Sequence, residues 1–532
     1  MRLYPTRPAV DLAIAGSLSV VAGVAAQQSA IIGWGGALLL GLGVARGVTL
    51  LGVARVRSAG FEMLWADDVR LATLGRGEEI CLNAEVRNRD SRATRFVHLR
   101  AVHSPGLDIT IEPNNGEVPA SGRLRVTVRV RALRVGHHGI HGLSLELRGG
   151  PDLFEIPLTF ANAFGINVLP AAYAASLRSP RGGRSGLISP AGNFGRTRGP
   201  GSELRELREH QAGDPLKHIA WKASARRGML LVRDHDVEER DVVWIALDAS
   251  VEHWAGPAGE APMDRAIDEA ATLAVEHSRH GDRIGLVILG RRVLAELPPD
   301  AGKKHLMQLL ADLSHRSSCF DHDRSALDDV AVARRVYEHM KPLFPSLAKG
   351  VSYRESGRLA ARAAAAMERA PLPVIPIDGS NNHDQTLRRY LSAFGLESSP
   401  KPEPDREKTD LQMADWLRQL PRRRPAATIL YIWSPSPTAQ QRPEIHKALQ
   451  KRQRRRLRLH WLPIHLGVDS PDLEPLPSAA SLAVRWRSES AEARGQTELN
   501  QLGIQTHSPL KIRAPGHGPA PRRNAHQVQE DG

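Results

Sequence analysis

The sequence predicts a multi-domain chain with an N-terminal transmembrane helical hairpin, a β-sandwich-like module, and a doubly wound α/β domain that carries a mostly helical insertion. Three observations predict this order. Two nearly uncharged apolar runs stand at the start, hydrophobic residues then alternate with a period of two, and apolar strands finally alternate with helical patterns. The length of 532 residues agrees, because chains of that size usually form several domains.

The first element, residues 1–57, is a predicted pair of membrane helices. The apolar runs Leu12–Ala26 and Ile31–Ala45 are split by the polar pair Gln27-Gln28. Each run is shorter than the roughly 20 residues that span a bilayer, but the second lengthens if Arg46 reaches toward the headgroups. Arginines flank the pair on both outer sides and the connecting turn is uncharged, so the positive-inside rule places both ends in the cytoplasm.

Two alternatives compete with a membrane hairpin. A cleaved signal peptide begins in a similar way, but a second apolar run directly after it is not expected. A buried hairpin of a soluble protein is disfavoured by the glycine-rich second run, because glycine is costly inside helices in water. Gly43 and Gly47 also have the spacing that lets membrane helices approach closely. We therefore expect a multi-pass protein of the cell inner membrane whose soluble domains face the cytoplasm.

Residues 58–170 are predicted to form the β-sandwich-like module. Apolar and polar residues alternate in Ile80–Val86 and in Leu124–Val130, and turn signals such as Pro113–Gly116 separate the runs. This pattern is typical of antiparallel sheets with one solvated face. Such modules usually position or bind other groups.

Residues 203–468 are predicted to form the doubly wound α/β domain. Val242–Leu247 is a continuous apolar run that ends at Asp248, as expected of a buried parallel strand whose carboxyl end carries function. Strand and helix patterns alternate after it. Residues 319–425 interrupt this alternation as a mostly helical insertion.

Two further segments are predicted to lack a packed core. Residues 171–202 are rich in Gly, Arg, Ser and Pro and are expected to be a linker. Residues 469–532 have a similar composition and are expected to be a disordered tail. The two cysteines exclude a disulfide scaffold.

The most informative segment is residues 203–236, where a series of motifs leads into the first strand of the α/β domain. The series is Leu207-Arg208, Gly213-Asp214, Ile219, Trp221-Lys222, Ala223-Ser224-Ala225-Arg226, Leu230 and Val232-Arg233. It resembles the core signature of the bacterial family called domain of unknown function 58, in which such a segment runs into a von Willebrand factor A-like domain. The family's layout, with two membrane helices and a β-rich module before a cytoplasmic A-like domain, agrees with the order predicted above.

The signature residues also have structural explanations. Gly213 permits a tight turn, Asp214 can cap the backbone N–H groups that follow it, and Trp221 offers a large anchor against a sheet. Lys222 and Arg226 stand four residues apart and would share one face of a helix. Fixing the join between two modules is therefore favoured over direct ligand binding.

The resemblance raises the question of a metal, because A-like domains often carry a metal-ion-dependent adhesion site. That site has Asp-x-Ser-x-Ser after the first strand, with a Thr and an Asp from later loops, and its oxygen ligands suit Mg²⁺. Here Asp248 and Ser250 match, Glu252 replaces the last serine, and Ser434 stands where an Asp is usual. We therefore expect a degenerate site that needs no cofactor, with Mg²⁺ binding as one alternative. The other alternative is that Asp248 caps the next helix or accepts hydrogen bonds from the loop backbone.

The sequence shows no catalytic constellation. Asp248 has no paired base or nucleophile, and His315, Cys319 and His322 fit no established zinc pattern. The histidines within residues 137–141 lie in a glycine-punctuated stretch that is expected to be an exposed turn. We therefore do not expect an enzyme.

The net charge of +14 suggests an anionic neighbour. The densest basic run, Lys451–Arg458, is expected to be a solvated helix end. Because no aromatic residues interleave it, contact with lipid is a better functional alternative than nucleic acid. The leading hypothesis is a membrane-anchored scaffold or adaptor whose A-like domain recruits partner proteins, and the resemblance implies that it works with a MoxR-type AAA+ ATPase. The alternative is a membrane-tethered binder of nucleic acid or another anionic polymer.

Overall fold

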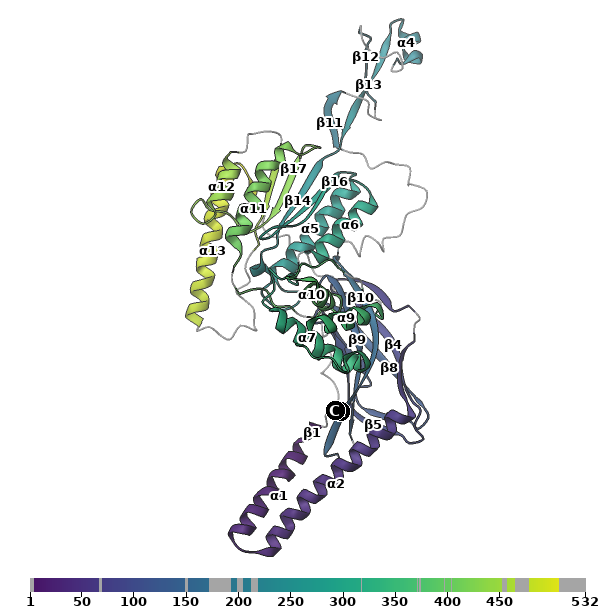
Figure 1. Ribbon diagram of the computed structural model, residues 1–532. Coiled ribbons are helices and arrows are strands. Elements are labelled where there is room, and N and C mark those ends of the chain that lie inside the picture. Colours follow the sequence, from purple (N-terminus) through teal and green to yellow (C-terminus); the bar gives the residue numbers. More distant parts are fainter. Residues whose placement is uncertain are drawn as a thin grey trace, which may run out of the picture. The chain divides into compact units, whose positions relative to one another are not determined.

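The computed structural model divides into two compact units, each of which is described by itself (Figure 1). The first comprises Met1–Leu169 and Cys319–Ser399, and the second comprises Pro170–Ser318 and Pro400–Arg513. The structure describes residues 4–506 except 67–68, 149–151, 172–192, 199–203, 212–218, 317, 371, 373–374, 397, 403, 452–456 and 465–477.

Two apolar helices begin the first unit, α1 (Arg7–Ala25) and α2 (Ser29–Ala59). Both are long and apolar enough to cross a membrane, α2 over Ser29–Gly52. Their large apolar side chains face outward, as the exposed fractions of Leu18 (63%) and Leu40 (72%) indicate. The other residues that the structure describes therefore do not cover these side chains.

Glycines let α1 and α2 approach closely, but the contact does not use the pair that the spacing singled out. A Cβ atom on Gly35 would lie 2.7 Å from the carbonyl oxygen of Gly16. A Cβ atom on Gly43 or Gly47 would meet no neighbouring atom within 4 Å. The prediction for Gly43 and Gly47 is therefore wrong, because the backbones approach closely between Gly16 and Gly35 instead.

Replacing Gly35 by alanine is expected to weaken the pairing of α1 with α2, because the new methyl group overlaps the backbone of the other helix. Overpacking of this kind costs about 1–3 kcal/mol. Unfolding of the full chain in mixed micelles measures the loss. Gly43→Ala is the matched control and is expected to change little, so equal losses in the two variants would contradict the close approach.

A β-sandwich follows the helices. One sheet contains, in spatial order, β2 (Phe61–Trp65), β4 (Glu79–Asn88), β8 (Arg123–Ala132) and β6 (Leu107–Glu112). The other contains β1 (Tyr4–Pro5), β10 (Phe154–Leu169), β9 (Gly136–Arg148), β5 (Thr94–His103) and β7 (Gly116–Val118). Pairing is antiparallel except where β3 (Leu71–Gly75) runs parallel to β10.

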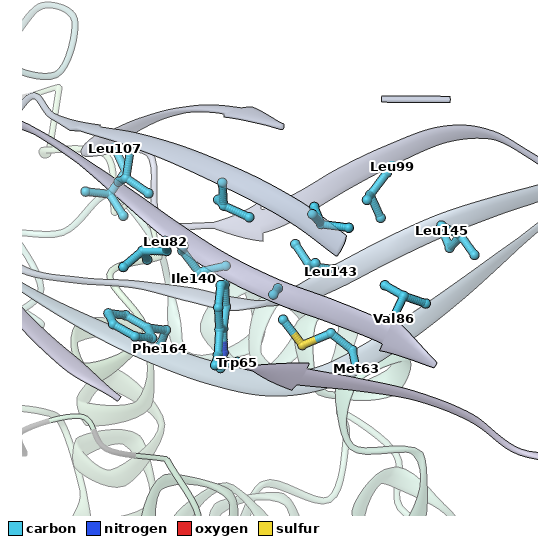
Figure 2. Packing of buried hydrophobic residues seen from close by; sticks show 14 of the residues in the cluster. Met63, Trp65, Leu82, Val86, Leu99, Leu107, Ile140, Leu143, Leu145 and Phe164 are labelled. Carbon is cyan, nitrogen blue, oxygen red and sulfur yellow. The ribbon is translucent and has the colours of Figure 1, made fainter. Parts of the chain in front are cut away.

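Apolar residues of both sheets form one core, which Figure 2 shows. Val86 of β4 and Leu143 of β9 are fully buried, and the rings of Trp65 and Phe164 meet edge to face at 5.2 Å. The period-two alternation places these side chains inward and the charged ones outward. The predicted antiparallel sandwich is confirmed.

Both ends of the helical pair are attached to the sandwich. Before α1, β1 pairs with β10, and the Thr6 hydroxyl donates to the Leu153 carbonyl at 3.1 Å. Near the end of α2, Arg55 Nε donates to Asp90 Oδ2 at 2.8 Å. The helices and the sandwich are therefore joined by contacts as well as by the chain.

Four helices from the predicted insertion belong to this first unit: α7 (Asp329–Leu343), α8 (Pro345–Ala348), α9 (Ser356–Glu368) and α10 (Asn382–Ala393). Helices α7, α9 and α10 lie beside β9 and β10 in Figure 1. The Ser104 hydroxyl donates to the Phe394 carbonyl at 2.8 Å across this contact. Residues 319–399 thus interrupt the α/β domain in chain order but pack on the sandwich.

The second unit contains a six-stranded sheet. Its spatial order is β16 (Val293–Asp300), β15 (Arg283–Leu289), β14 (Val242–Asp248), β17 (Ile429–Trp433), β18 (Arg458–Leu462) and β19 (Gln505–Thr506). Pairing is parallel except for the edge strand β16. Every residue of β14 is buried. The predicted α/β region with a parallel sheet is confirmed.

Helices cover this sheet. They are α5 (Pro262–Arg279), α6 (Lys303–His315), α11 (Arg406–Gln419), α12 (Pro443–Gln450) and α13 (Ser478–Gln501). Trp244 and Ala246 of β14 share a core with residues of α11, α12 and α13. The rings of Trp244 and Trp416 meet edge to face at 5.4 Å within it.

The prediction of a disordered tail at 469–532 is wrong for residues 478–506, which form α13 and β19. Leu499 and Ile504 are buried in the core of the second unit. The average composition hides these few apolar residues, which supply enough burial to order a helix. Residues 465–477 and 507–532 lie outside the described part.

A smaller three-stranded sheet precedes the α/β sheet, in the order β11 (Asn193–Arg198), β13 (Leu231–Glu239) and β12 (Leu204–Glu209). A short helix, α4 (Trp221–Arg227), lies in the connection between β12 and β13. Most of the linker predicted at 171–202 lies outside the described residues, and its described part includes strand β11.

Candidate functional site

The strand order creates a reversal point beside β14. The chain continues from β14 to β15 and β16 on one side and later adds β17, β18 and β19 on the other. Ligands of open α/β sheets bind beyond the carboxyl ends of the strands at such a point. Asp248 ends β14 and Ser434 follows β17, so two polar residues from distant parts of the sequence meet there.

The carboxylate of Asp248 is buried and accepts hydrogen bonds on both oxygens. Oδ1 accepts from the backbone nitrogen of Ser250 at 3.1 Å and from its hydroxyl at 2.6 Å. Oδ2 accepts from the Ser434 hydroxyl at 2.6 Å. The predicted pair of Asp248 and Ser250 is therefore brought together, but as a hydrogen-bonded turn.

Arg442 supplies the positive charge at this point. It is 2% exposed, and its Nη2 lies 3.5 Å from Asp248 Oδ2. Its Nε donates to both carboxylate oxygens of Asp410 at 2.9 and 3.0 Å, and its Nη1 donates to the Ser434 hydroxyl at 2.7 Å. One guanidinium group thus serves two buried carboxylates and a hydroxyl, as its planar set of donors allows.

The two carboxyl groups differ in their pKa. Burial alone would raise the pKa of Asp248, but the neighbouring His253 and Arg442 and the hydroxyls of Ser250 and Ser434 lower it to about 2. Burial raises the pKa of Asp410 above its ordinary value, despite its hydrogen bonds from Arg442. Asp248 is therefore the more firmly ionised partner of the guanidinium.

Glu252, the third predicted metal candidate, has its own cation. Its Oε1 accepts from Nη2 of Arg406 at 3.0 Å and from Nε at 3.2 Å. Arg406 begins α11, the helix that also carries Asp410. The glutamate that replaces the usual serine thus forms an ion pair with the helix beside the site.

These residues do not fit Mg²⁺. Both oxygens of Asp248 are engaged by internal donors, and a guanidinium lies where a divalent cation would be repelled by it. Within the described ranges, no group of three or more His, Cys, Asp or Glu side chains could hold a metal ion. The site is a closed network of ion pairs and hydrogen bonds.

Arg442 and Asp410 were not identified from the sequence. A buried aspartate at a strand end requires a counter-charge, and Arg442 is the N-cap residue of α12, the helix that follows β17. That requirement is the signal that could have drawn attention to it. The need for a counter-charge does not indicate which of the many arginines supplies it, so the pairing of Arg442 with Asp248 could be identified only from the structure.

The family signature residues lie on the smaller sheet and its connection. Arg208 lies in β12, Gly213 and Asp214 lie outside the described residues, and Trp221, Lys222, Ser224 and Arg226 lie in α4. The expectation that Trp221 anchors against a sheet is wrong, because this residue is 63% exposed. Ser224 is the buried residue of α4.

Histidines in the first unit form a second polar cluster. His141 Nδ1 lies 2.9 Å from His339 Nε2, and His339 Nδ1 lies 2.8 Å from the Tyr390 hydroxyl. Burial lowers the pKa of His138 and of His339 to about 4, and it lowers the pKa of His141 well below its usual value. The predicted exposed turn at 137–141 is therefore wrong, because these residues lie in β9 beneath α7 and α10.

Comparison with known families and proteins agrees with the sequence resemblance. Residues 206–341 match the family described as "Protein of unknown function DUF58". Uncharacterized proteins of Mycobacterium tuberculosis and Mycobacterium bovis are 28% identical to the chain over 116 residues. These matches cover 22% of this chain and 37% of the relatives' length.

Similar solved structures include the ASH/PapD-like domain of human CEP192 and the BIgI domain of beta protein from S. agalactiae bound to CEACAM1. The first has 13% identity and a TM-score of 0.16, and the match covers 21% of this chain and 86% of that domain. The second has 13% identity and a TM-score of 0.13, with coverage of 20% and 96%.

Proposed function

Because residues 206–341 form a domain of the DUF58 family, we propose that this chain is a membrane-anchored, non-enzymatic scaffold whose α/β domain recruits partner proteins. It works with a MoxR-type AAA+ ATPase in the assembly or remodelling of a complex. In this proposal α1 and α2 form a transmembrane hairpin in the inner membrane, and the soluble parts face the cytoplasm.

The strand order supports a doubly wound, von Willebrand factor A-like domain. Numbered from β14, the order is 3-2-1-4-5-6, which is common among doubly wound sheets. Asp248 and Ser250 stand after the first strand, as in metal-dependent A domains, with Arg442 in place of a cation. Recruitment through this domain is therefore proposed to need no metal.

The apolar surface of α1 and α2 supports the membrane anchor. Both helices are long and apolar enough to cross a bilayer, and the other described residues leave side chains such as Trp34 exposed (74%). Arginines at the outer ends favour a cytoplasmic position for both ends. The attachment of β1 and Arg55 to the sandwich would hold the soluble part close to the anchor.

The scaffold proposal depends on one observation: protein side chains occupy the reversal point of the six-stranded sheet. Asp248, Arg442 and Asp410 satisfy one another in the position where α/β proteins usually hold a ligand. A domain built in this way offers partners its outer surfaces. The other hypothesis, an anionic-polymer binder, depends on residues 451–458, of which 452–456 lie outside the described part.

Co-purification tests the proposal. The tagged full chain, extracted from bacterial membranes in mild detergent, is expected to retain a MoxR-type ATPase. A variant without residues 1–57 is expected to leave the membrane fraction but still bind the ATPase. If the variant without residues 1–57 is still found in the membrane fraction, the proposed anchor is contradicted. If the ATPase is absent from the full-length preparation, the proposed partnership is contradicted.

A further inference from the structure

The surface of α4 combines exposed apolar and cationic side chains. Trp221, Met229 and Leu230 are 63%, 46% and 48% exposed, and Leu207 of β12 is also exposed. A large tryptophan exposed on the same short segment as other exposed apolar residues is unusual on a surface that only meets water. We define this set, with the exposed Lys222, Arg226 and Arg227, as the α4 surface.

The helix that presents this surface is fixed to the hairpin of β12 and β13. The Ser224 hydroxyl donates to the Ala220 carbonyl at 3.0 Å and accepts from the Leu231 backbone nitrogen at 2.9 Å. The Ala220 nitrogen donates to the Leu231 carbonyl at 2.8 Å, and Gly228 ends the helix with a φ of 69°. Because the helix is held by these buried bonds, Trp221 is presented in a preformed position, which lowers the entropic cost of binding.

The three cations of the α4 surface have no acidic partner among the side chains that the structure describes. Lys222 and Arg226 stand one helical turn apart, and Arg227 follows directly. Tryptophan and arginine are the residues that most often dominate the binding energy of protein interfaces. Unmatched positive charge around an exposed tryptophan therefore calls for a negatively charged partner with an apolar recess.

We propose that the α4 surface is the docking site for an acidic protein surface, with Trp221 as its central anchor and Lys222, Arg226 and Arg227 as its charged rim. A protein is favoured over an anionic bilayer because α4 has only seven residues, which is about 10 Å of helix. Helices that lie in the membrane interface are usually longer and have a continuous apolar face. The inference rests on the proposed scaffold function and gives its recruiting surface a location.

Binding of the purified MoxR-type ATPase to the full chain in detergent tests this inference. Trp221→Ala is expected to weaken binding about 30-fold or more, as loss of an interface anchor does. Trp486→Ala is the matched control, because Trp486 is 76% exposed on α13 and belongs to another surface. Its affinity is expected to equal that of the unaltered chain.

Charge reversal supplies the second measurement. Arg226→Glu is expected to weaken binding and to flatten its dependence on salt. Lys303→Glu makes an equal change of net charge at an exposed residue of α6 and is expected to leave both unchanged. Circular dichroism of each variant verifies its fold.

Three outcomes separate the possibilities. Unaltered affinity of Trp221→Ala for an ATPase that the chain does bind would overturn the docking site and leave the scaffold function standing. Failure of the unaltered chain to bind the ATPase would overturn both. Loss of binding to phosphatidylglycerol vesicles in Trp221→Ala, with ATPase binding retained, would overturn the protein partner in favour of a lipid surface.

Discussion

Replacing Arg442 by methionine is expected to lower the free energy of unfolding of the α/β unit by about 3–5 kcal/mol, because two buried carboxylates lose their counter-charge. Asp248 and Asp410 both accept from this guanidinium and both are buried. Chemical unfolding of the full chain in detergent, followed by tryptophan fluorescence, measures the change. Trp461 is a suitable reporter, since its Nε1 donates to the Ser434 carbonyl at 2.8 Å.

A surface ion pair provides the matched control for this variant. Arg418 pairs with Asp415 at 2.7 Å and with Glu444 at 2.8 Å, but its side chain is 39% exposed. Arg418→Met is expected to cost less than about 1 kcal/mol, because water replaces its contacts. Equal losses for Arg418→Met and Arg442→Met would contradict the central role of the buried network.

Removing the charge of one of the two carboxylates is expected to restore part of the stability that Arg442→Met loses. Adding Asp410→Asn to Arg442→Met eliminates one uncompensated carboxylate, so the double variant should unfold less readily than the single one. Mg²⁺ is expected to leave the stability of the unaltered chain unchanged, because its guanidinium opposes a second cation. Stabilisation of the unaltered chain by Mg²⁺ would show that Arg442 does not fill the metal position.

Lowering the pH from 7 to 5 is expected to destabilise the sandwich unit. His137, His138 and His339 have a pKa lowered by burial from 6.5 to about 4, and burial together with His339 holds the pKa of His141 well below its usual value. The unfolded chain therefore binds more protons than the folded chain below pH 6.5. The stability that these neutral histidines allow is complete above pH 6.5 and falls as the pH approaches 4.

The size of this loss of stability follows from how far the pKa of each histidine is lowered. One histidine with a pKa lowered from 6.5 to about 4 costs about 2 kcal/mol at pH 5, where most of the unfolded copies are charged. Urea unfolding with limited proteolysis, read by mass spectrometry of fragments from 94–169 and 329–399, measures the unit by itself. His339→Gln is expected to reduce the difference between the two pH values. Equal urea midpoints at pH 7 and pH 5 in the unaltered chain would contradict the burial of neutral histidines.

The sequence predicts the elements whose signal is local. The apolar run that forms β14 and the alternation that forms β8 each contain their own period, so strand type and buried face follow directly. The tail helix α13 was missed because its signal consists of a few apolar residues in a polar segment. The average composition of a segment does not reveal a few apolar residues, whereas their burial depends on their individual positions.

The sequence predicted Asp248, Ser250 and Ser434 of the candidate site, but not Arg442 and Asp410. Asp248 and Ser250 are neighbours in sequence and could be recognised by spacing. Arg442 is 194 positions from Asp248, and His339 is 198 positions from His141. Pairings of that separation depend on how the chain returns to a sheet, which a single sequence with many arginines and histidines does not specify.

The division of the chain between its units has a consequence for synthesis. In the described part, the chain passes from one unit to the other after residues 169, 318 and 399. On the ribosome, β9 and β10 emerge long before α7 and α10. The face that these two strands form therefore stays uncovered while the first strands of the α/β sheet are synthesised. A nascent chain halted near residue 318 would hold two unfinished cores at once, and an excised fragment 203–468 would contain the covering helices without their sheet.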